Sequence, residues 1–365
     1  MIKFPKINII IKLKQMKRVF FTVMAVVLIF TSACDKKPDE NIENEIKITT
    51  TASGSIAIRM AGSGTITIDW GDGTDVETHT LQESVDDNNW AGAIGFFYFH
   101  EYSETSSTHT IIITGENITH LDCCRLKLTS LDVSKNTALT YLDCSWTQLA
   151  SLDVSKNTAL TILSCVGNQL KKMNVSKNTA LTHLYCTVNQ LESLDVSKNI
   201  ALTNLWCEGN QLTSLDVSKN TALTVLFCVG IQLSSLDVSK NTALTVLYCH
   251  DNKLTSLDVS KNIVLTDLSC YQNKLTNLDV SKNTVLISLS CEDNQLESLD
   301  MSKNTVLTSL NCSNNQLDVA ALNYLFVTLP IATGLSKNLY ISNNPGTSSC
   351  DRSIATNKGW TFRDW

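Results

Sequence analysis

The sequence predicts a mainly β protein in which a solenoid of about ten coils follows a small β-sandwich domain. Three observations predict this fold. A pentad, Asp-Val-Ser-Lys-Asn or a close variant, recurs every 21 residues from Asp132 to Asp300, and a cysteine recurs with the same period from Cys123 to Cys312. Ahead of these repeats, residues 48–115 contain segments that alternate apolar and polar side chains with the period of a β-strand. Repetition at a fixed period of roughly 20 to 50 residues is typical of coils that stack on one another.

Composition and charge restrict the classes of function. The chain has 365 residues, of which 43% are hydrophobic, and this is enough to build packed cores. Its formal net charge is −6, and no cluster of Lys and Arg stands out in the body of the chain. Because a nucleic acid is bound through such clusters, we expect no nucleic-acid partner.

The N-terminal segment predicts export from the cytoplasm. Residues 1–33 contain six basic residues, no acidic residue and an apolar run from Val19 to Phe30, which is typical of a secretory signal peptide. The following Thr31-Ser32-Ala33-Cys34 resembles the lipobox of bacterial lipoproteins. This resemblance implies that Cys34 is lipidated and anchors the protein to a bacterial membrane of the cell envelope. The alternative is an ordinary signal peptide in which Cys34 has no role.

We expect the outer membrane to carry the anchor, and whether the protein faces the cell surface stays open. Residues 34–47 are polar and charged, with one Pro and no aromatic residue, so they predict a tether between the lipid and the first folded domain. The lipid is the only membrane contact that we expect.

Residues 48–115 predict the small β domain. Trp70-Gly71-Asp72-Gly73-Thr74 follows one predicted strand and supplies turn residues, and a His-x-Tyr sequence follows at 100–102. This combination resembles the PKD-type immunoglobulin-like β-sandwich. Trp70 is expected in the core and Asp72 in a turn, and the resemblance implies a spacer or adhesive module. The alternative is a calcium site formed by Asp69, Asp72 and Asp75.

Residues 116–317 predict the solenoid, and each repeat in this range has two similar halves. In residues 139–157 the halves are Leu-x-x-Leu-x-Cys-x-x-Thr-x-Leu and Leu-x-x-Leu-x-Val-x-x-Asn, and most other repeats have Asn in place of that Thr. Alternate residues of a short strand point the same way, so the Leu, Cys and Val side chains are expected to fill the core. The side-chain amide of each Asn can satisfy backbone groups inside a bend.

This pattern resembles leucine-rich repeats, specifically the nested 21-residue subclass termed IRREKO, from Ile118 to Leu317. The resemblance implies a solenoid that binds partners through its sheet face. Residues 318–365 are expected to cap the far end, with a helix at 319–329, a strand at 339–341 and Trp360 in the core.

The ten periodic cysteines leave three interpretations. Stacked neighbours with parallel Cβ directions lie about 4.8 Å apart, which is wide for a disulfide. A single row of thiols provides no convergent metal site. The favoured interpretation is therefore a small hydrophobic residue, and we expect no metal and no cofactor. Cys124 and Cys350 lie outside the period and have no assigned role.

The positions that vary between coils predict the interaction site. The residue before each periodic cysteine points away from the core, and in four successive coils it is aromatic. An exposed apolar patch usually marks an interaction site, and Tyr and Trp are favoured anchors. The predicted partner-binding residues are Tyr141, Trp146, Tyr185, Trp206, Phe227, Tyr248, Tyr271, His183, Glu208 and His250.

We expect the partner to be a protein, which the sequence does not identify. Two alternatives remain: a glycan bound by the same aromatic residues, or a structural stalk without a ligand. The six histidines are scattered, and the common catalytic motifs of metalloproteases, serine hydrolases and P-loop enzymes do not occur. We therefore expect no catalytic residues and no enzymatic activity.

Overall fold

The computed structural model describes residues 44–84, 95–103, 107–332 and 337–363. The predicted signal peptide, Cys34 and the tether up to residue 43 lie outside the described residues, so those predictions stay predictions. No helix in these ranges has the length and apolar character needed to cross a bilayer.

Six strands ahead of the repeats form the β domain. They are β1 (Glu45–Thr50), β2 (Gly54–Gly62), β3 (Thr65–Asp69), β4 (Glu77–Thr80), β5 (Phe96–Tyr102) and β6 (His109–Gly115). β1 begins inside the range predicted as tether, because Ile46 and Ile48 are fully buried and alternate with more exposed residues. Strands β2 and β5 belong to one sheet and the other four to a second sheet. The sheets contact each other through rings such as Tyr98 of β5 and His79 of β4.

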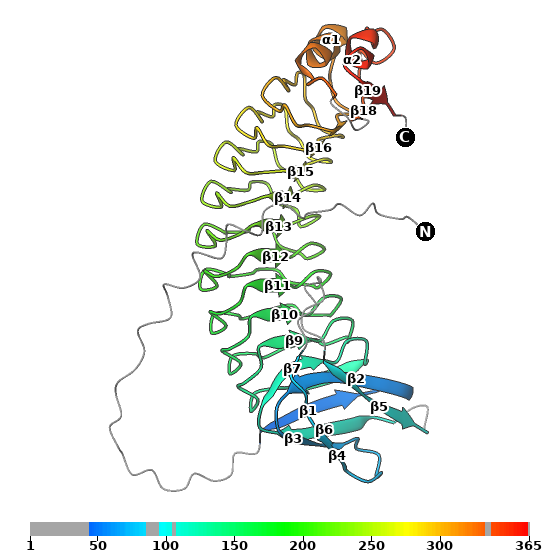
Figure 1. Ribbon diagram of the computed structural model, residues 1–365, viewed down its shortest axis with the longest axis vertical. Coiled ribbons are helices and arrows are strands. Elements are labelled where there is room, and N and C mark those ends of the chain that lie inside the picture. The colour runs from blue at the N-terminus through cyan, green and yellow to red at the C-terminus, as the bar shows by residue number, and fades with distance from the viewer. Residues whose placement is uncertain (1–43, 85–94, 104–106, 333–336, 364–365) are drawn as a thin grey trace, which may run out of the picture. The chain divides into compact units, whose positions relative to one another are not determined.

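The repeats form a stack of 21-residue coils, which confirms the predicted mainly β solenoid. β7 (Ile118–Asp122) and β8 (Leu128–Asp132) come first. The later coils contribute β9 (Tyr141–Asp143), β10 (Ile162–Ser164), β11 (His183–Tyr185), β12 (Asn204–Trp206), β13 (Val225–Phe227), β14 (Val246–Tyr248), β15 (Asp267–Ser269), β16 (Ser288–Ser290) and β17 (Ser309–Asn311). These strands pair in parallel and in register, so the coils follow one another in chain order (Figure 1).

The first coil is joined directly to the β domain. β7 pairs with β9 on one side and with β2 on the other, while β8 pairs antiparallel with β1. Within the described residues, one sheet of 14 strands therefore runs from β5 through β2 and β7 into the solenoid, and the second sheet has the order β4-β3-β6-β1-β8. β8 lies inside the range predicted as solenoid. The boundary expected at residue 115 does not separate two sheets, because the first coil's strand edges are paired with the β domain.

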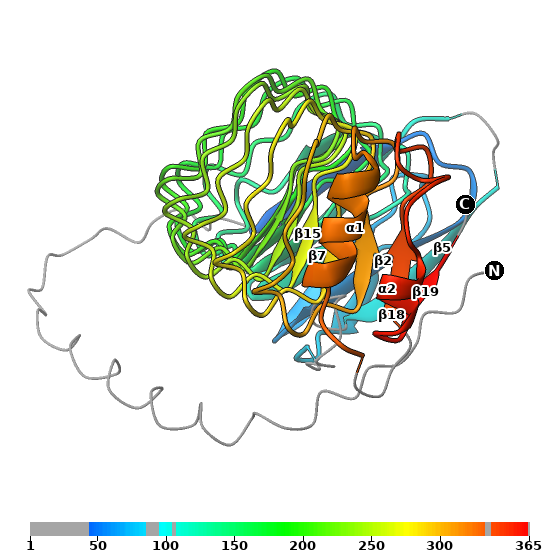
Figure 2. The same ribbon diagram turned by 90° about the horizontal axis from the view of Figure 1, so that it is seen from above.

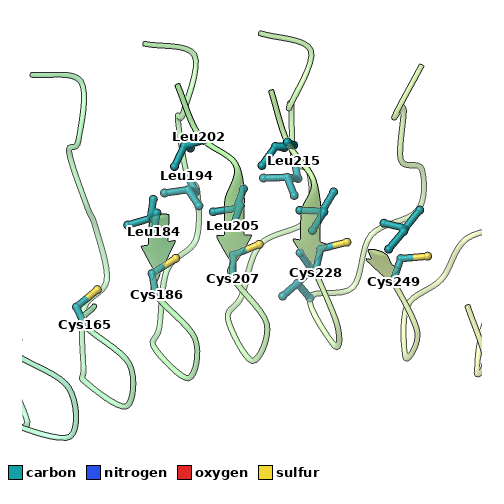
Figure 3. Close-up of a cluster of buried hydrophobic side chains, with 14 of the residues drawn as sticks. Cys165, Leu184, Cys186, Leu194, Leu202, Leu205, Cys207, Leu215, Cys228 and Cys249 are labelled. Carbon is teal, nitrogen blue, oxygen red and sulfur yellow. The ribbon is translucent and has the colours of Figure 1, made fainter. Parts of the chain in front are cut away.

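Leu, Cys and Val side chains fill the interior of the stack. In the coil of β12, Leu205, Cys207 and Val217 are completely buried. Figure 3 shows the sulfur atoms of successive cysteines following one another along one side of the core. All cysteines in the described ranges are free thiols. Burial holds the pKa of Cys207 well above its usual value, so the thiol stays protonated, and its Sγ lies 3.5 Å from the carbonyl oxygen of Phe227. It is a buried apolar group with one weak hydrogen bond.

Two buried asparagines in each typical coil hold the backbone at the bends. Nδ2 of Asn210 donates to the carbonyl oxygens of Cys207 and of the cysteine one coil earlier, both at 3.0 Å. Nδ2 of Asn220 donates to the carbonyl oxygens of Val196 at 3.0 Å and Asn199 at 2.8 Å. The predicted role of the asparagine amides inside the bends is confirmed, and both amides also link neighbouring coils.

Threonines just before the strands provide a third ladder between coils. Oγ1 of Thr203 donates to the carbonyl oxygen of Thr182 at 3.1 Å, and the same contact recurs at Thr224 and Thr245. Ile287 interrupts this ladder because it has no hydroxyl group, and its side chain is exposed. The repeat pattern identifies this position as polar, but the hydrogen-bond partner follows only from the stacking of the coils.

The C-terminal residues cover the last coil. Helix α1 (Val319–Thr328) begins at the N-cap Asp318, and its hydroxyl Thr328 Oγ1 accepts the N–H of Met301 at 3.1 Å. Seen along the stack, α1 lies across the end of the coils (Figure 2). β18 (Lys337–Tyr340) continues the parallel sheet from β17, followed by α2 (Ser353–Thr356) and β19 (Trp360–Phe362). Trp360 is buried, as predicted, and its Nε1 donates to the carbonyl oxygen of Pro330 at 2.8 Å.

We predict that Asn220→Ala lowers the free energy of unfolding by about 2 kcal/mol, because two buried carbonyl oxygens each lose one of their two hydrogen-bond donors. Urea unfolding followed by circular dichroism measures this change. The control is Thr221→Ala, which alters an exposed neighbour on the same bend. Equal stabilities of the two variants would show that the amide ladder does not hold the coils together.

Candidate interaction surface

Each coil of the solenoid presents three side chains on the face of the 14-stranded sheet that points away from the core. In the coil of β12 these are Asn204, Trp206 and Glu208, which are all half-buried, while Leu205 and Cys207 between them are completely buried. Because the strands pair in register, like positions form three parallel rows along the sheet. We call this surface the sheet face.

The middle row contains four stacked rings, which we call the aromatic column: Tyr185, Trp206, Phe227 and Tyr248. The strand register places each ring directly beside the next. Successive ring centroids are 4.7, 5.0 and 4.6 Å apart, with interplanar angles of 55°, 15° and 3°. All four side chains are half-buried, so part of each ring faces solvent. The aromatic residues therefore project outward as a contiguous column while the thiols beside them point inward.

The orientation of these rings determines what they can contact. Phe227 and Tyr248 are almost parallel at 4.6 Å, and Trp206 lies over the other side of Phe227 at 5.0 Å. No further ring fits between planes at these distances, so the faces of Phe227 are already occupied. Phe227 therefore offers its edge, rather than a face, to a ligand.

Histidines and a further tyrosine extend the column on both sides. His183 meets the edge of Tyr185 at 5.9 Å, and His250 stacks on Tyr271 at 4.0 Å. Nδ1 of His250 lies 3.0 Å from Ser269 Oγ. Burial lowers the pKa of His183 and of His250, so both rings are mainly neutral at neutral pH. The two histidines therefore add apolar area to the sheet face rather than positive charge.

Two residues of the predicted site do not belong to the exposed sheet face. Tyr141 is only 7% exposed and stacks on His120 at 5.6 Å, so its burial removes it from the candidate surface. Trp146 is 51% exposed but lies in the turn after β9, where its ring covers the backbone of Gly167. The other eight residues of the predicted set lie on the sheet face.

Carboxylates flank the aromatic column. Glu208 lies two residues after Trp206, and burial raises the pKa of its carboxyl group. Burial, and to a smaller extent the charge of nearby Asp267, raises the pKa of the Tyr248 hydroxyl. Glu292 lies one coil beyond Tyr271, and burial raises its pKa from 4.5 to about 7. Sequence reasoning did not select Glu292, although extending the row by one more coil would have found it.

The sheet face continues into the β domain. Strand pairing aligns Phe97 of β5, Arg59 of β2, Asp122 of β7 and Asp143 of β9 along the line of the aromatic column. Arg59 forms an ion pair with Asp122 at 2.6 Å and lies 5.4 Å from the ring centroid of Phe97, which is 55% exposed. The sequence pattern contains no sign of this continuity, because it arises from pairing between strands that lie far apart in the chain.

In the predicted turn of the β domain, Asp72 is hydrogen-bonded to the backbone and to a histidine. Oδ1 of Asp72 accepts the backbone N–H of Thr74 at 3.1 Å, and hydrogen bonds from Thr74 are the main cause that lowers the pKa of Asp72 to about 2. Oδ2 of Asp72 lies 2.7 Å from His100 Nε2, and Trp70 is completely buried. Across the described parts of the chain, no group of three or more His, Cys, Asp or Glu side chains is arranged to hold a metal.

We predict that Glu292→Gln raises the thermal unfolding midpoint at pH 8 and changes it little at pH 4.5. A carboxyl group whose folded pKa is about 7 binds a proton more tightly in the folded than in the unfolded state. Its stabilising contribution is complete below pH 4.5 and is lost as the pH rises through 7, and glutamine mimics the protonated form. Glu297→Gln, at an exposed position on the same coil, controls for the loss of one negative charge. An equal effect of both variants at pH 8 would contradict the prediction.

Comparisons with known proteins agree with this fold. No family profile and no curated protein matches the chain. The functional domain of InlJ from Listeria monocytogenes, which includes a cysteine ladder, is 36% identical with a TM-score of 0.61, over 71% of this chain and 56% of that one. The chain thus spans little more than half of that domain. An internalin (inlF) from the same species is 20% identical with a TM-score of 0.51, over 68% of this chain and 86% of that one. The chain is a leucine-rich repeat solenoid similar to those of bacterial internalins.

Proposed function

We propose that this protein is a non-catalytic binding protein of the cell envelope that recognises a protein partner through the aromatic column. The half-exposed stack of Tyr185, Trp206, Phe227 and Tyr248 is the observation that carries the proposal. Large aromatic side chains bury much area and lose little conformational freedom, so they are frequent anchors of protein interfaces. A leucine-rich repeat solenoid is typically a scaffold for such interactions.

The ring orientation favours a protein over a glycan. A sugar ring binds an aromatic residue by lying flat against its face, whereas the faces of Phe227 are covered by rings at 4.6 and 5.0 Å. Ring edges and the half-buried histidines beside them suit aliphatic and aromatic side chains of a polypeptide. The geometry thus supports the protein partner among the functions that the sequence left open.

The same surface gives no support to catalysis. The histidines nearest the column, His183 and His250, lie three coils apart. Among the described residues, no third side chain is hydrogen-bonded to the Ser269–His250 pair to complete a nucleophilic triad. A sheet face of this kind holds a ligand by contact alone, which agrees with the absence of catalytic motifs from the sequence.

We predict that the double variant Trp206→Ala/Phe227→Ala loses at least about tenfold in affinity for the protein partner, because two adjacent anchors are removed. The measurement is a quantitative pull-down from cell extracts, followed by titration of the recovered protein against both forms. The matched control is Ile200→Ala/Ile263→Ala, which removes two exposed apolar side chains from another edge of the coils. A partner that binds all three forms equally would refute recognition by the column.

A glycan array with the same three forms tests the other candidate ligand. Sugar binding that depends on Trp206 and Phe227 would replace the protein partner by a glycan. If neither a protein nor a glycan depends on these residues, the solenoid is a structural stalk.

We propose further that Cys34 carries the lipid that anchors the chain to a bacterial membrane, on the basis of the preceding Thr31-Ser32-Ala33 sequence. Cys34→Ala is expected to release the protein from the membrane fraction, as fractionation and immunoblotting would measure. Cys124→Ala, which alters a cysteine outside the signal segment, serves as the control. Retention of Cys34→Ala in the membrane fraction would contradict lipidation at this residue.

A further inference from the structure

Charge is distributed unevenly over the solenoid. Residues 116–317 contain 15 Lys and Arg residues, yet none of them occupies the three outward rows of the sheet face. The same rows contain five carboxylates: Asp122, Asp143, Glu208, Asp267 and Glu292. The lysines of the repeated pentad lie on the opposite half of each coil. The sheet face therefore combines an aromatic centre with negative charge.

Among these carboxylates only Asp122 has a cationic partner in the described residues, namely Arg59. Asp267 accepts the hydroxyl of Thr266 at 2.8 Å, which is a neutral donor. Oε2 of Glu208 and Oε2 of Glu292 are both buried and have no hydrogen-bond partner among the described residues. A half-buried carboxylate without a counter-ion is destabilised when it ionises, and a positive group brought by a partner would remove that penalty.

The described residues supply no such group near the column. Arg59 is already bonded to Asp122 and lies over Phe97. The neutral rings of His183 and His250 do not offset the charge of the neighbouring carboxylates. Lys253 donates to Gln232 Oε1 at 3.0 Å in a turn beyond the rows.

We propose that the partner bound by the aromatic column is a polypeptide segment in which Lys or Arg residues flank apolar anchor residues. This inference rests on the proposed function and adds the chemistry of the partner. The apolar anchors lie against the ring edges of Trp206 and Phe227. The cationic side chains meet Glu208 in the coil of Trp206, and Asp267 and Glu292 further along the sheet face. Opposite charge at such positions gives specificity and speeds association, while the apolar anchors supply most of the affinity.

The test is selection from a phage-displayed library of random peptides on the full chain. Three further forms are compared with it: Trp206→Ala/Phe227→Ala, the amide variant Glu208→Gln/Asp267→Asn/Glu292→Gln, and the control Glu192→Gln/Asp216→Asn/Glu297→Gln. The control has the same net charge as the amide variant, and its three altered residues are exposed and lie off the sheet face. Thermal unfolding of each form establishes that it is folded.

We expect the full chain to select peptides enriched in Lys or Arg next to aromatic or aliphatic residues. Synthetic versions of these peptides should bind the amide variant about tenfold more weakly than the control, and high ionic strength should reduce that difference. Peptides that depend on Trp206 and Phe227 but show no preference for Lys or Arg would overturn the inference and leave the proposed function standing. Peptides that bind the aromatic variant as well as the full chain would overturn both.

Discussion

The structure depends on the hydrogen bonds of the buried asparagine side chains at the bends. A coil of 21 residues must reverse direction within a few residues, and the reversal directs backbone carbonyl groups into the interior. Asn210 satisfies one such group in its own coil and one in the preceding coil, whereas both carbonyl groups bound by Asn220 belong to the bend of the preceding coil. Because the same amide serves both purposes, the bend and the stacking of the coils are one requirement. An insertion inside a repeat would interrupt both.

The register that the asparagines impose also organises the surface. Whatever residue precedes the cysteine in one coil lies beside the same position in the next, so a short run of aromatic substitutions becomes a column such as Tyr185 to Tyr248. Repetition of Asp and Lys in the pentads fixes mixed charge on the opposite half of each coil. The residues of the sheet face vary between coils, and they include both aromatic rings and carboxylates. The core and the sheet face are thus two sides of the same short strands.

Both ends of the stack need a cover, because an exposed coil would present unpaired strand edges and apolar side chains. At the N-terminal end β1 and β2 pair with the first coil, and at the C-terminal end β18, β19 and α1 complete the core. The N-terminal cover does more than close the stack. It extends the sheet face by Arg59 and Phe97, which strand pairing places on the line of the aromatic column.

The sequence by itself determined the coil length, the inward direction of Leu205 and Cys207, and the outward direction of Trp206, since each follows from a local period. It could not determine that Tyr141 is buried under its contacts with His120, because burial there depends on neighbouring strands. The repeat pattern also could not predict that β1 pairs with β8, since the two strands lie far apart in the chain. Only the tertiary structure decided the orientation of the rings in the aromatic column. It also decided that Glu292 has no counter-ion among the described residues. Both depend on side chains from different coils, which stacking alone brings together.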